Sequence, residues 1–460
     1  MSRPLHLTQW QHHLSTRFPD LPTPVVAVLA LYSFGLLLAQ VSGLTTITYF
    51  LAKHLGRPAD ALRKRLSEFY KEAAAKSGVH QGQKRRDFDV ATCFAPLLRW
   101  ALSLWSGRHL ALAIDVTNLA DRFHVLCVSV VVGGVGIPVA WKVLRGGVKD
   151  PWAPYWQKLL ALLKTAVPAD WTVIVLSDRG LESADLFRFI KDLNWHPLMR
   201  VKKGGKFRPT GWHTFHYFHQ LVRQVDASFY AEGLAYAGEQ LPSTLLGFWA
   251  AGHEEPWLLL TDLPPEAGHA VWYAFRSWIE QGFKVIKGGG WEWQYTRMDD
   301  PGRVERLWLV LAVATLWVVA LGAADEAQEK IREELKGLER RLTETQQQAQ
   351  ARLERERLRL EKQRAAQQAQ KQARQAQKQA KKPAAAPTAS APKKGQEKAP
   401  GGATAKRRAL RLSLRGLAVL KAAWDQGQNP LPQHLHPEPW PEPCHSPTTL
   451  TEQDFLYQQT

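Results

Sequence analysis

The spacing of hydrophobic and polar residues changes several times along the 460 residues of this chain. The first hundred residues have helical spacing, as in Leu62, Leu66 and Phe69, which lie three and four residues apart. From about residue 109 to residue 201, apolar runs of strand length alternate with helical stretches. After residue 325, Glu, Gln, Arg, Lys and Ala largely replace the apolar residues. The pattern predicts a helical N-terminal part, an α/β core and a polar helical tail.

Two of the strands predicted in the core end in a carboxylate. The core elements are strands over 109–115, 123–132, 137–144, 171–178 and 195–201, and helices over 151–167 and 181–193. This βββαβαβ order is that of a ribonuclease H-like sheet. Asp115 closes the first strand and Asp178 closes the fourth. Because these two strands can lie side by side in such a sheet, we expect both carboxylates at one edge.

The helices before the core include one with a strongly basic face. These helices are predicted over 24–40, 45–55 and 59–70. Arg63, Lys64 and Arg65 stay outside the apolar positions of the last one. A helix, a tight Gly-containing turn and a basic helix resemble a helix-turn-helix DNA reader. A small helical bundle with a basic surface has the same pattern, and both interpretations stay open.

Residues 202–267 break the α/β alternation. Short aromatic segments separated by turn signals predict a mostly β insertion here. Trp257 lies where a turn leads into an apolar strand, so it is a candidate for stacking on an unpaired base, with Trp249 as the next candidate. The alternative is that Trp257 is simply part of the core of the insertion.

Two apolar runs, 25–39 and 307–322, raise the question of a membrane. They have about 15 and 16 residues, fewer than the roughly 20 needed to span a bilayer. We therefore predict buried helices and no membrane partner.

The tail has little apolar patterning. Ile331, Leu335, Leu338 and Leu342 keep heptad-like spacing over barely two heptads, which makes a stable coiled coil doubtful. The remaining tail is predicted as a flexible linker over 383–402, a short basic helix over 406–424 and a disordered Pro-rich end over 430–447.

The composition points to a polyanionic partner. The formal net charge is +18 and the sequence pI is about 9.8. The chain has 19 Trp residues, a high count that suits stacking on bases, although most of them are expected in the core. Its three Cys residues, Cys93, Cys127 and Cys444, have no CxxC spacing, which argues against a disulfide scaffold or a structural zinc site.

One polar stripe is predicted between residues 273 and 287. On a helix with 100° per residue, Tyr273, Arg276, Glu280, Lys284 and Lys287 fall within an arc of about 80°. Such a stripe is ordinarily a solvated face with i, i+4 ion pairs. A metal site is the other interpretation of this stripe. Glu280 would be one carboxylate ligand, and Asp115 and Asp178 at the strand ends would be the other two.

The same residues resemble a known signature. Tyr273, Arg276, Glu280 and Lys287 match all positions and spacings of the Y-R-E-K signature of DDE transposases of the fourth bacterial insertion-sequence family. The segments around Asp115 and Asp178 are similar to the two Asp motifs of that family. The long gap before Glu280 resembles its β-strand insertion. The resemblance covers about residues 90–320, and the low-complexity tail is a departure from it.

The resemblance implies a cut-and-paste DNA transposase. Asp115, Asp178 and Glu280 would be its catalytic triad and would hold two Mg²⁺ ions, with Mn²⁺ as an alternative. Tyr273, Arg276, Lys284 and Lys287 would contact the DNA end, with a hairpin intermediate in some members of the family. The implied partners are transposon-end and target DNA and a second copy in the DNA complex, in the bacterial cytoplasm at the nucleoid. The rival interpretations are another ribonuclease H-like nuclease and an inactive or domesticated DNA-binding copy.

The expected organisation is a ribonuclease H-like core with a mostly β insertion, preceded by helices and followed by a helical and low-complexity tail. The boundaries are 1–87 for the helical DNA-binding domain, 88–201 and 268–323 for the core, 202–267 for the insertion, 324–402 for the linker and 403–460 for the basic helix and C-terminus.

Overall fold

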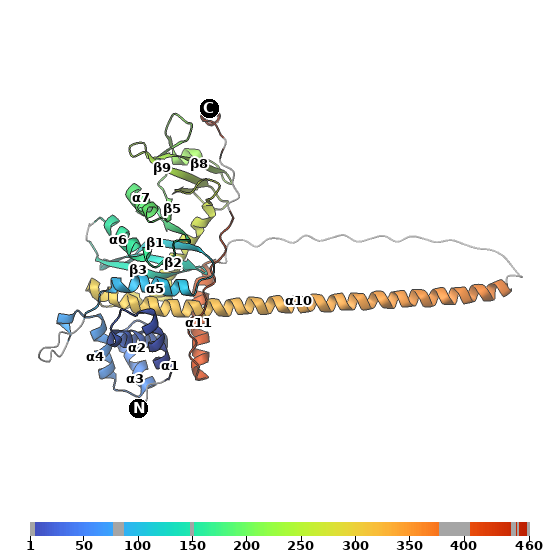
Figure 1. Cartoon of the computed structure of the whole chain (residues 1–460), viewed down its shortest axis with the longest axis horizontal. Helices are drawn as coiled ribbons and strands as arrows, with labels where there is room; N and C mark the ends of the chain where they lie inside the picture. The colour runs from blue at the N-terminus through green and yellow to red at the C-terminus, as the bar shows by residue number, and fades with distance from the viewer. Residues whose placement is uncertain are drawn as a thin grey trace. The chain divides into compact units, whose positions relative to one another are not determined.

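The computed structural model describes residues 5–76, 87–147, 151–376, 405–442, 448 and 450–457. Within the chain, residues 1–325 and 403–460 form one compact unit, and residues 326–402 form a second. The first unit holds the sheet, the N-terminal helices and the C-terminal segment, and it is coloured from blue to yellow and again red in Figure 1.

A mixed sheet of ten strands dominates the first unit. Its strand order is β3-β2-β1-β4-β5-β10-β9-β8-β6-β7. The strands are β1 (His109–Leu119), β2 (Phe123–Val132), β3 (Val135–Arg145), β4 (Thr172–Ser177), β5 (His196–Arg200), β6 (Lys206–Pro209), β7 (His216–Tyr217), β8 (Ser228–Ala235), β9 (Leu241–Phe248) and β10 (Trp257–Thr261).

The first five strands confirm the predicted ribonuclease H-like arrangement. β1 pairs with β2 and β2 with β3 in antiparallel fashion, whereas β1 with β4 and β4 with β5 are parallel. The parallel strands β4 and β5 are linked by α7 (Ala184–Asp192), and β3 is linked to β4 by α6 (Ala153–Lys164). Near-continuous Val, Ile and Leu in these strands suit a sheet that is covered on both faces.

The insertion continues the same sheet. β10 pairs antiparallel with β5 and with β9, so the strands of residues 206–261 add to the edge of the five-stranded core. The one short helix among them is α8 (Phe218–Leu221). This part of the chain is therefore mostly β. It joins the core at β5, which lies beside β4, the strand that Asp178 directly follows.

The N-terminal helices are part of the common core. They are α1 (Leu5–Arg17), α2 (Thr23–Ala39), α3 (Leu44–Leu55) and α4 (Ala59–Tyr70), followed after a gap by α5 (Phe94–Ser103). Trp10 of α1 stacks on Trp317 at 3.5 Å between ring centroids. The helical domain expected over 1–87 thus shares its buried side with the rest of the unit.

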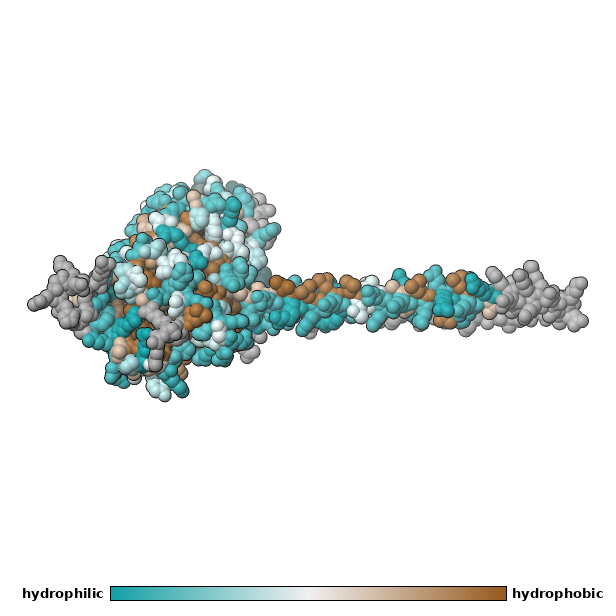
Figure 2. Space-filling view, turned by 60° about the horizontal axis from the view of Figure 1, so that its bottom comes forward, coloured by the Kyte–Doolittle hydropathy of each residue, from teal (hydrophilic) through white to brown (hydrophobic). Residues whose placement is uncertain are grey.

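The buried helix expected over 307–322 is the start of a much longer helix, α10 (Pro301–Ala376). Its apolar window is 94% buried inside the protein, which is typical of a core helix even though its length would allow a membrane span. The helix does not stop at residue 323, because Glu, Lys, Arg, Gln and Ala all favour helix. From residue 328 to residue 365 all of its residues except Gly337 are exposed (Figure 2).

The expectation of a disordered C-terminus needs correction. After α11 (Ala405–Asp425), the described residues up to 442 belong to the first unit, and the last described helix is α12 (Glu452–Tyr457), while residues 443–447 lie outside the described residues. Leu435 is fully buried, and its N–H donates to the carbonyl of Leu104 at 2.6 Å. The Pro-rich segment packs because its few large side chains fill gaps on the core surface. The linker predicted over 383–402 and residue Cys444 lie outside the described residues.

Candidate active site

The two aspartates occupy the adjoining strands β1 and β4. The parallel pairing of these strands ends at Ala113 and Leu176, so Asp115 and Asp178 follow it by two residues each. Asp178 comes directly after β4 and accepts a hydrogen bond from the N–H of Gly180 at 2.9 Å. Asp115 is not the end of its strand as expected, because β1 continues to Leu119 against β2. The carboxylates nevertheless lie at the same edge of the parallel pair.

The third carboxylate is carried by α9 (Ser277–Lys284). The predicted single helix over 273–287 is made of three parts: a 3₁₀ turn over Ala270–Arg276, α9, and a π-helical turn over Val285–Gly289. The changes of pitch distort the predicted stripe, which assumed one constant pitch. They leave Tyr273 buried and Glu280 and Lys284 exposed, with Lys287 half-buried.

A close approach of backbones fixes α9 on the sheet. A Cβ atom on Gly282 would collide with the carbonyl oxygen of Gly136 in β3. Glycine is therefore needed in α9 at this point, because any side chain would push the helix away from the strand. Ile279, fully buried, packs into the same contact.

Arg276 joins the three carboxylates. Its Nη2 lies 2.9 Å from Oδ2 of Asp115 and 3.3 Å from Oδ2 of Asp178, and its Nη1 contacts Oε1 of Glu280. The guanidinium is only 14% exposed, like the carboxylate of Asp115. The structure therefore brings together all three predicted acidic residues around one predicted cation.

The electrostatics follow from burial and from this shared cation. Burial raises the pKa of Asp115 to about 6, although Arg276 opposes the shift. Burial also disfavours the charged form of Arg276, but its acidic neighbours outweigh that effect and hold its pKa above the ordinary value. The guanidinium and the three carboxylates therefore stabilise one another's charged forms only while the guanidinium stays between the carboxylates.

Tyr273 and Trp257 form the wall next to this group. Burial raises the pKa of Tyr273 to about 12, against the influence of Arg276 and Arg200, so its phenol is neutral at physiological pH. The guanidinium of Arg200 lies over the Tyr273 ring at 6.0 Å. Trp257 is half-buried and meets the same ring edge-on at 5.7 Å between centroids.

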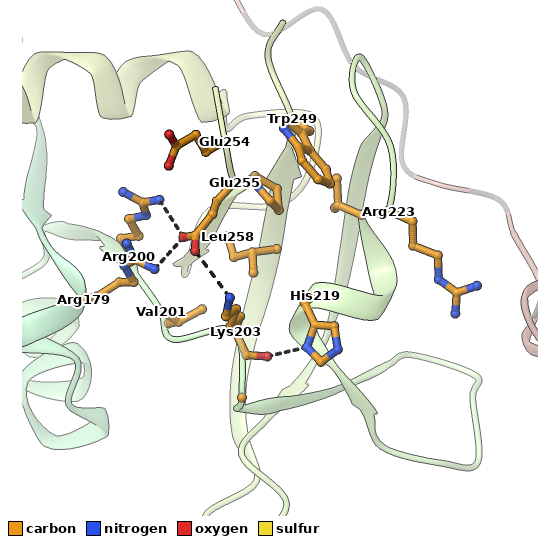
Figure 3. Close-up of a pocket in the computed structure, with 13 residues that line it drawn as sticks. Arg179, Arg200, Val201, Lys203, His219, Arg223, Trp249, Glu254, Glu255 and Leu258 are labelled. Atoms are coloured by element: carbon orange, nitrogen blue, oxygen red, sulfur yellow. Dashed lines mark hydrogen bonds and ion pairs between the residues drawn. The ribbon is translucent and has the colours of Figure 1, made fainter. Parts of the chain in front are cut away.

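A basic cavity adjoins the site and was not predicted from the sequence. It has a volume of about 610 Å³, and its lining includes Arg179, Arg200 and Lys203 (Figure 3). These cations surround Glu255, with Arg179 at 2.7 Å and Lys203 at 3.4 Å from its carboxylate oxygens. Trp249, the second stacking candidate, also lines this cavity. The one signal in the sequence is that Arg179 directly follows Asp178.

The basic residues of α4 lie elsewhere. Arg63 and Lys64 are exposed and Arg65 is half-buried. Figure 1 places α4 among the N-terminal helices, on the other side of the start of α10 from the sheet. Lys64 and Arg65 border a cavity of about 540 Å³ there. The structure therefore separates these candidate DNA-binding residues from the carboxylates.

The donor set of the site suits a hard divalent cation, since all three acidic groups offer carboxylate oxygens. In the part of the chain that the structure describes, however, no three His, Cys, Asp or Glu side chains are arranged to hold a metal ion as they stand. The guanidinium of Arg276 lies where the three carboxylates meet. A cation at that point requires Arg276 to move.

Residues 153–317 match the family model of the transposase DDE domain. This part of the chain is similar to a transposase DDE domain. The match includes Asp178, Arg276 and Glu280 and begins after Asp115. It confirms the resemblance to DDE transposases without selecting one insertion-sequence family.

Other comparisons are weaker. A solved structure similar to the chain is the cryo-EM synaptic complex of piggyBac transposase with hairpin DNA, with 12% identity and a TM-score of 0.34. The similarity covers 67% of this chain and 73% of that chain, and at this score it carries no argument. No curated protein matches the sequence.

Proposed function

We propose that the chain is a metal-dependent transposase that moves an insertion sequence of the fourth bacterial family by a cut-and-paste reaction. The observation that carries the proposal is the meeting of Asp115, Asp178 and Glu280 around Arg276, with two of the three acids inside the DDE domain. DNA is the partner, as expected for a chain with a net charge of +18.

The acidic residues would hold the divalent ions, two Mg²⁺ or Mn²⁺, that such enzymes use. Bound there, such ions would supply activation of the attacking oxygen and charge stabilisation of the leaving oxygen of the phosphodiester. Hydrolysis of a phosphodiester bond at the transposon end would free a 3′-OH. This 3′-OH would then attack a phosphodiester bond of the target DNA. Arg276 would exchange its carboxylate partners for a phosphate of the DNA end, which frees the carboxylates. Tyr273, Lys284 and Lys287 would hold the terminal phosphates beside it.

The basic cavity gives the DNA end a place next to the chemistry. Arg179, Arg200 and Lys203 would take a backbone phosphate in place of the Glu255 carboxylate. Trp257, or Trp249 in the cavity wall, would stack on a base displaced from the end if the reaction passes through a hairpin. Arg63, Lys64 and Arg65 would contact DNA away from the carboxylates. Two copies would act on the two ends, at the nucleoid in the bacterial cytoplasm.

The test uses the DNA that flanks this reading frame in its genome. The protein is expected to nick duplexes carrying the flanking inverted repeats in the presence of Mg²⁺ or Mn²⁺, with a free 3′-OH at the element's end. Nicking of unrelated duplexes at the same rate would indicate a general nuclease instead. Specific binding with no cleavage under any divalent ion would indicate an inactive DNA-binding copy.

A further inference from the structure

A second cavity, of about 740 Å³, lies where the N-terminal helices meet the start of α10. Its lining comes from the turn between α2 and α3, from α4 and from residues 292–307. It is distinct from the carboxylate cluster and from the basic cavity, which have other lining residues. Cavities of this size are typical of sites for small organic ligands. This one is therefore a separate candidate binding site.

The first turn of α3 lines this cavity and leaves backbone donors available. Gly43 is the N-cap residue, and no described side chain caps the helix. The N–H of Ile47 donates to the carbonyl of Gly43 at 3.0 Å. The preceding N–H groups, those of Leu44, Thr45 and Thr46, have no intrahelical partner. A helix start of this kind carries partial positive charge and suits a bound phosphate.

Three arginines add positive charge to the same lining. They are Arg63, Arg297 and Arg303. Arg63 and Arg297 are exposed, and neither makes an ion pair with any residue that the structure describes. Arg303 pairs with Glu72 at 3.3 Å, but its Nε has no hydrogen-bond partner among the described residues. Guanidinium groups bind phosphate oxygens through parallel N–H donors, so the arginines point to the same ligand as the helix start.

Tyr32 supplies independent evidence for an occupant of the cavity. It lines the cavity from α2 and is only 1% exposed. Its hydroxyl has no hydrogen-bond partner within the described residues. Buried polar groups are nearly always hydrogen-bonded, and a ligand in the cavity would supply the missing partner.

The remaining lining favours a nucleotide over a bare phosphate ion. Tyr295 is 71% exposed, so a base can stack on its ring. Glu292 and Asp299 also line the cavity, and their carboxylates can accept hydrogen bonds from sugar hydroxyls and from the amino groups of bases. These carboxylates would only repel a bare phosphate. We propose that the cavity binds a nucleotide, with its phosphate at the start of α3 and its base on Tyr295.

Two sources offer this chemistry: a free mononucleotide, and a nucleotide within a DNA strand. A free mononucleotide would make the site independent of the proposed function. A nucleotide of a DNA strand rests on that function, because it would add an anchor for DNA away from the carboxylates. The experiments below separate the two sources.

The first test is isothermal titration calorimetry of the full-length protein with dAMP and with deoxyadenosine, which lacks the phosphate. EDTA keeps divalent ions from the carboxylate cluster. A free-nucleotide site should bind dAMP at least about tenfold more tightly than deoxyadenosine, because only dAMP reaches the helix start with a charge.

The decisive pair of variants is Gly43→Asp and Gly43→Asn. Both side chains fit, since the nearest atom to a Cβ on Gly43 would be 3.7 Å away, and both can cap α3. Only Asp adds a negative charge where the phosphate would lie. Gly43→Asp should therefore bind the nucleotide about tenfold more weakly than Gly43→Asn. Thermal unfolding without ligand should show that neither variant is destabilised, because both residues are good N-caps.

A second pair of variants addresses the arginines. Arg297→Gln should weaken nucleotide binding by about tenfold. Lys158→Gln is the matched control, because it removes the same charge from an exposed residue of α6 outside the cavity and should leave the affinity unchanged.

The second test is fluorescence anisotropy of the same proteins with a labelled DNA duplex. A weaker affinity of Gly43→Asp than of Gly43→Asn for the duplex would support the site and assign it to a DNA strand. The same difference for dAMP alone would support it and assign it to a free nucleotide. Equal affinities of the two variants for both dAMP and the duplex would overturn the proposal. A wild-type protein that binds no DNA would instead contradict the proposed function, and the dAMP titrations would then decide on this site.

Discussion

At the scale of single residues, Arg276 is the group on which the carboxylate cluster depends. It faces Asp115, Asp178 and Glu280 at once, and its own Nε has no hydrogen-bond partner among the described residues. Three carboxylates this close repel each other when no cation lies between them. Arg276 therefore stabilises the site in the absence of DNA and competes with any other cation for the same oxygens.

Arg276→Ala should lower the free energy of unfolding by about 1–3 kcal/mol without divalent ions, because it leaves partly buried carboxylates unpaired. Mg²⁺ or Mn²⁺ should then raise the melting temperature of the variant more than that of the wild type. Thermal unfolding with and without the ions measures both effects. Arg188→Ala is the control, since the ion pairs of Arg188 are exposed and should matter by less than about 1 kcal/mol. A smaller ion-induced shift in Arg276→Ala than in the wild type would contradict this role of Arg276.

His13 gives the fold a pH dependence away from the site. Burial against Trp10 and Trp100 lowers its pKa from 6.5 to about 4, helped by Arg17 and His12. The unfolded chain binds this proton more readily, so the stabilisation is complete above about pH 6.5 and is lost as the pH falls towards 4.

His13→Phe should accordingly flatten the decrease in melting temperature between pH 7 and pH 5. Calorimetry of the two proteins across this range measures the slope. His12→Phe, which changes an exposed neighbour with the smallest named influence on this pKa, serves as the control and should alter the slope much less. An unchanged slope in His13→Phe would mean that another group causes the acid sensitivity.

At the scale of elements, the strands of the core were predictable and the turns on either side of α9 were not. β2 was predicted at its observed bounds because Val-rich strands buried on both faces leave a clear pattern. Asp178 was singled out by its place directly after such a strand, and Asp115 by a predicted strand end, although β1 continues past it to Leu119. The 3₁₀ and π turns around α9 escaped prediction because the pitch there is set by packing, as in the contact of Gly282 with Gly136.

The C-terminal segment escaped prediction for the same reason. Its sequence has no periodicity, yet Trp440 packs against Trp272 at 5.0 Å and His109 at 4.9 Å between ring centroids. The indole N–H of Trp272 donates to the carbonyl of Pro441 at 2.8 Å. Tertiary contacts of this kind, between residues separated by well over a hundred positions, leave no local signal in the sequence.

Trp440→Ala should loosen the turn that precedes α9, since Trp272 is the neighbour of Tyr273. We expect a loss of about 1–3 kcal/mol of stability, less than for a fully buried Trp. Hydrogen exchange should become faster over residues 270–289, and cleavage should fall more than DNA affinity. Trp424→Ala is the matched control, because Trp424 packs against Phe34 and Trp317 instead. Equal rates of hydrogen exchange over residues 270–289 in the two variants would show that Trp440 does not support the turn before α9.

At the scale of the whole molecule, the N-terminal helices are both a candidate DNA surface and part of the core. Because Trp10 of α1 stacks on Trp317 of α10, removal of the N-terminal helices would disrupt the core. Deletion of residues 1–70 would expose the apolar face of α10. Point substitutions of exposed residues are the appropriate probe of DNA recognition.

Arg63→Ala with Lys64→Ala should weaken binding to end DNA and lower the salt slope by about one unit for each lost phosphate contact. Fluorescence anisotropy over a series of salt concentrations measures the slope. The control is Arg340→Ala with Lys336→Ala on the exposed part of α10, which removes the same charge at a distance. Equal losses in the two double variants would show a general charge effect and no specific role for α4.

The central claim is that Asp115, Asp178 and Glu280 carry out strand cleavage. The most direct measurement is the nicking rate of Asp115→Asn, Asp178→Asn and Glu280→Gln on end DNA in Mg²⁺, alongside end binding by the same proteins. Each substitution removes one negative charge and little shape, so we predict that cleavage is abolished while the affinity for end DNA remains within a few-fold of the wild type. A variant of any of the three that binds and still nicks at close to the wild-type rate would contradict the assignment.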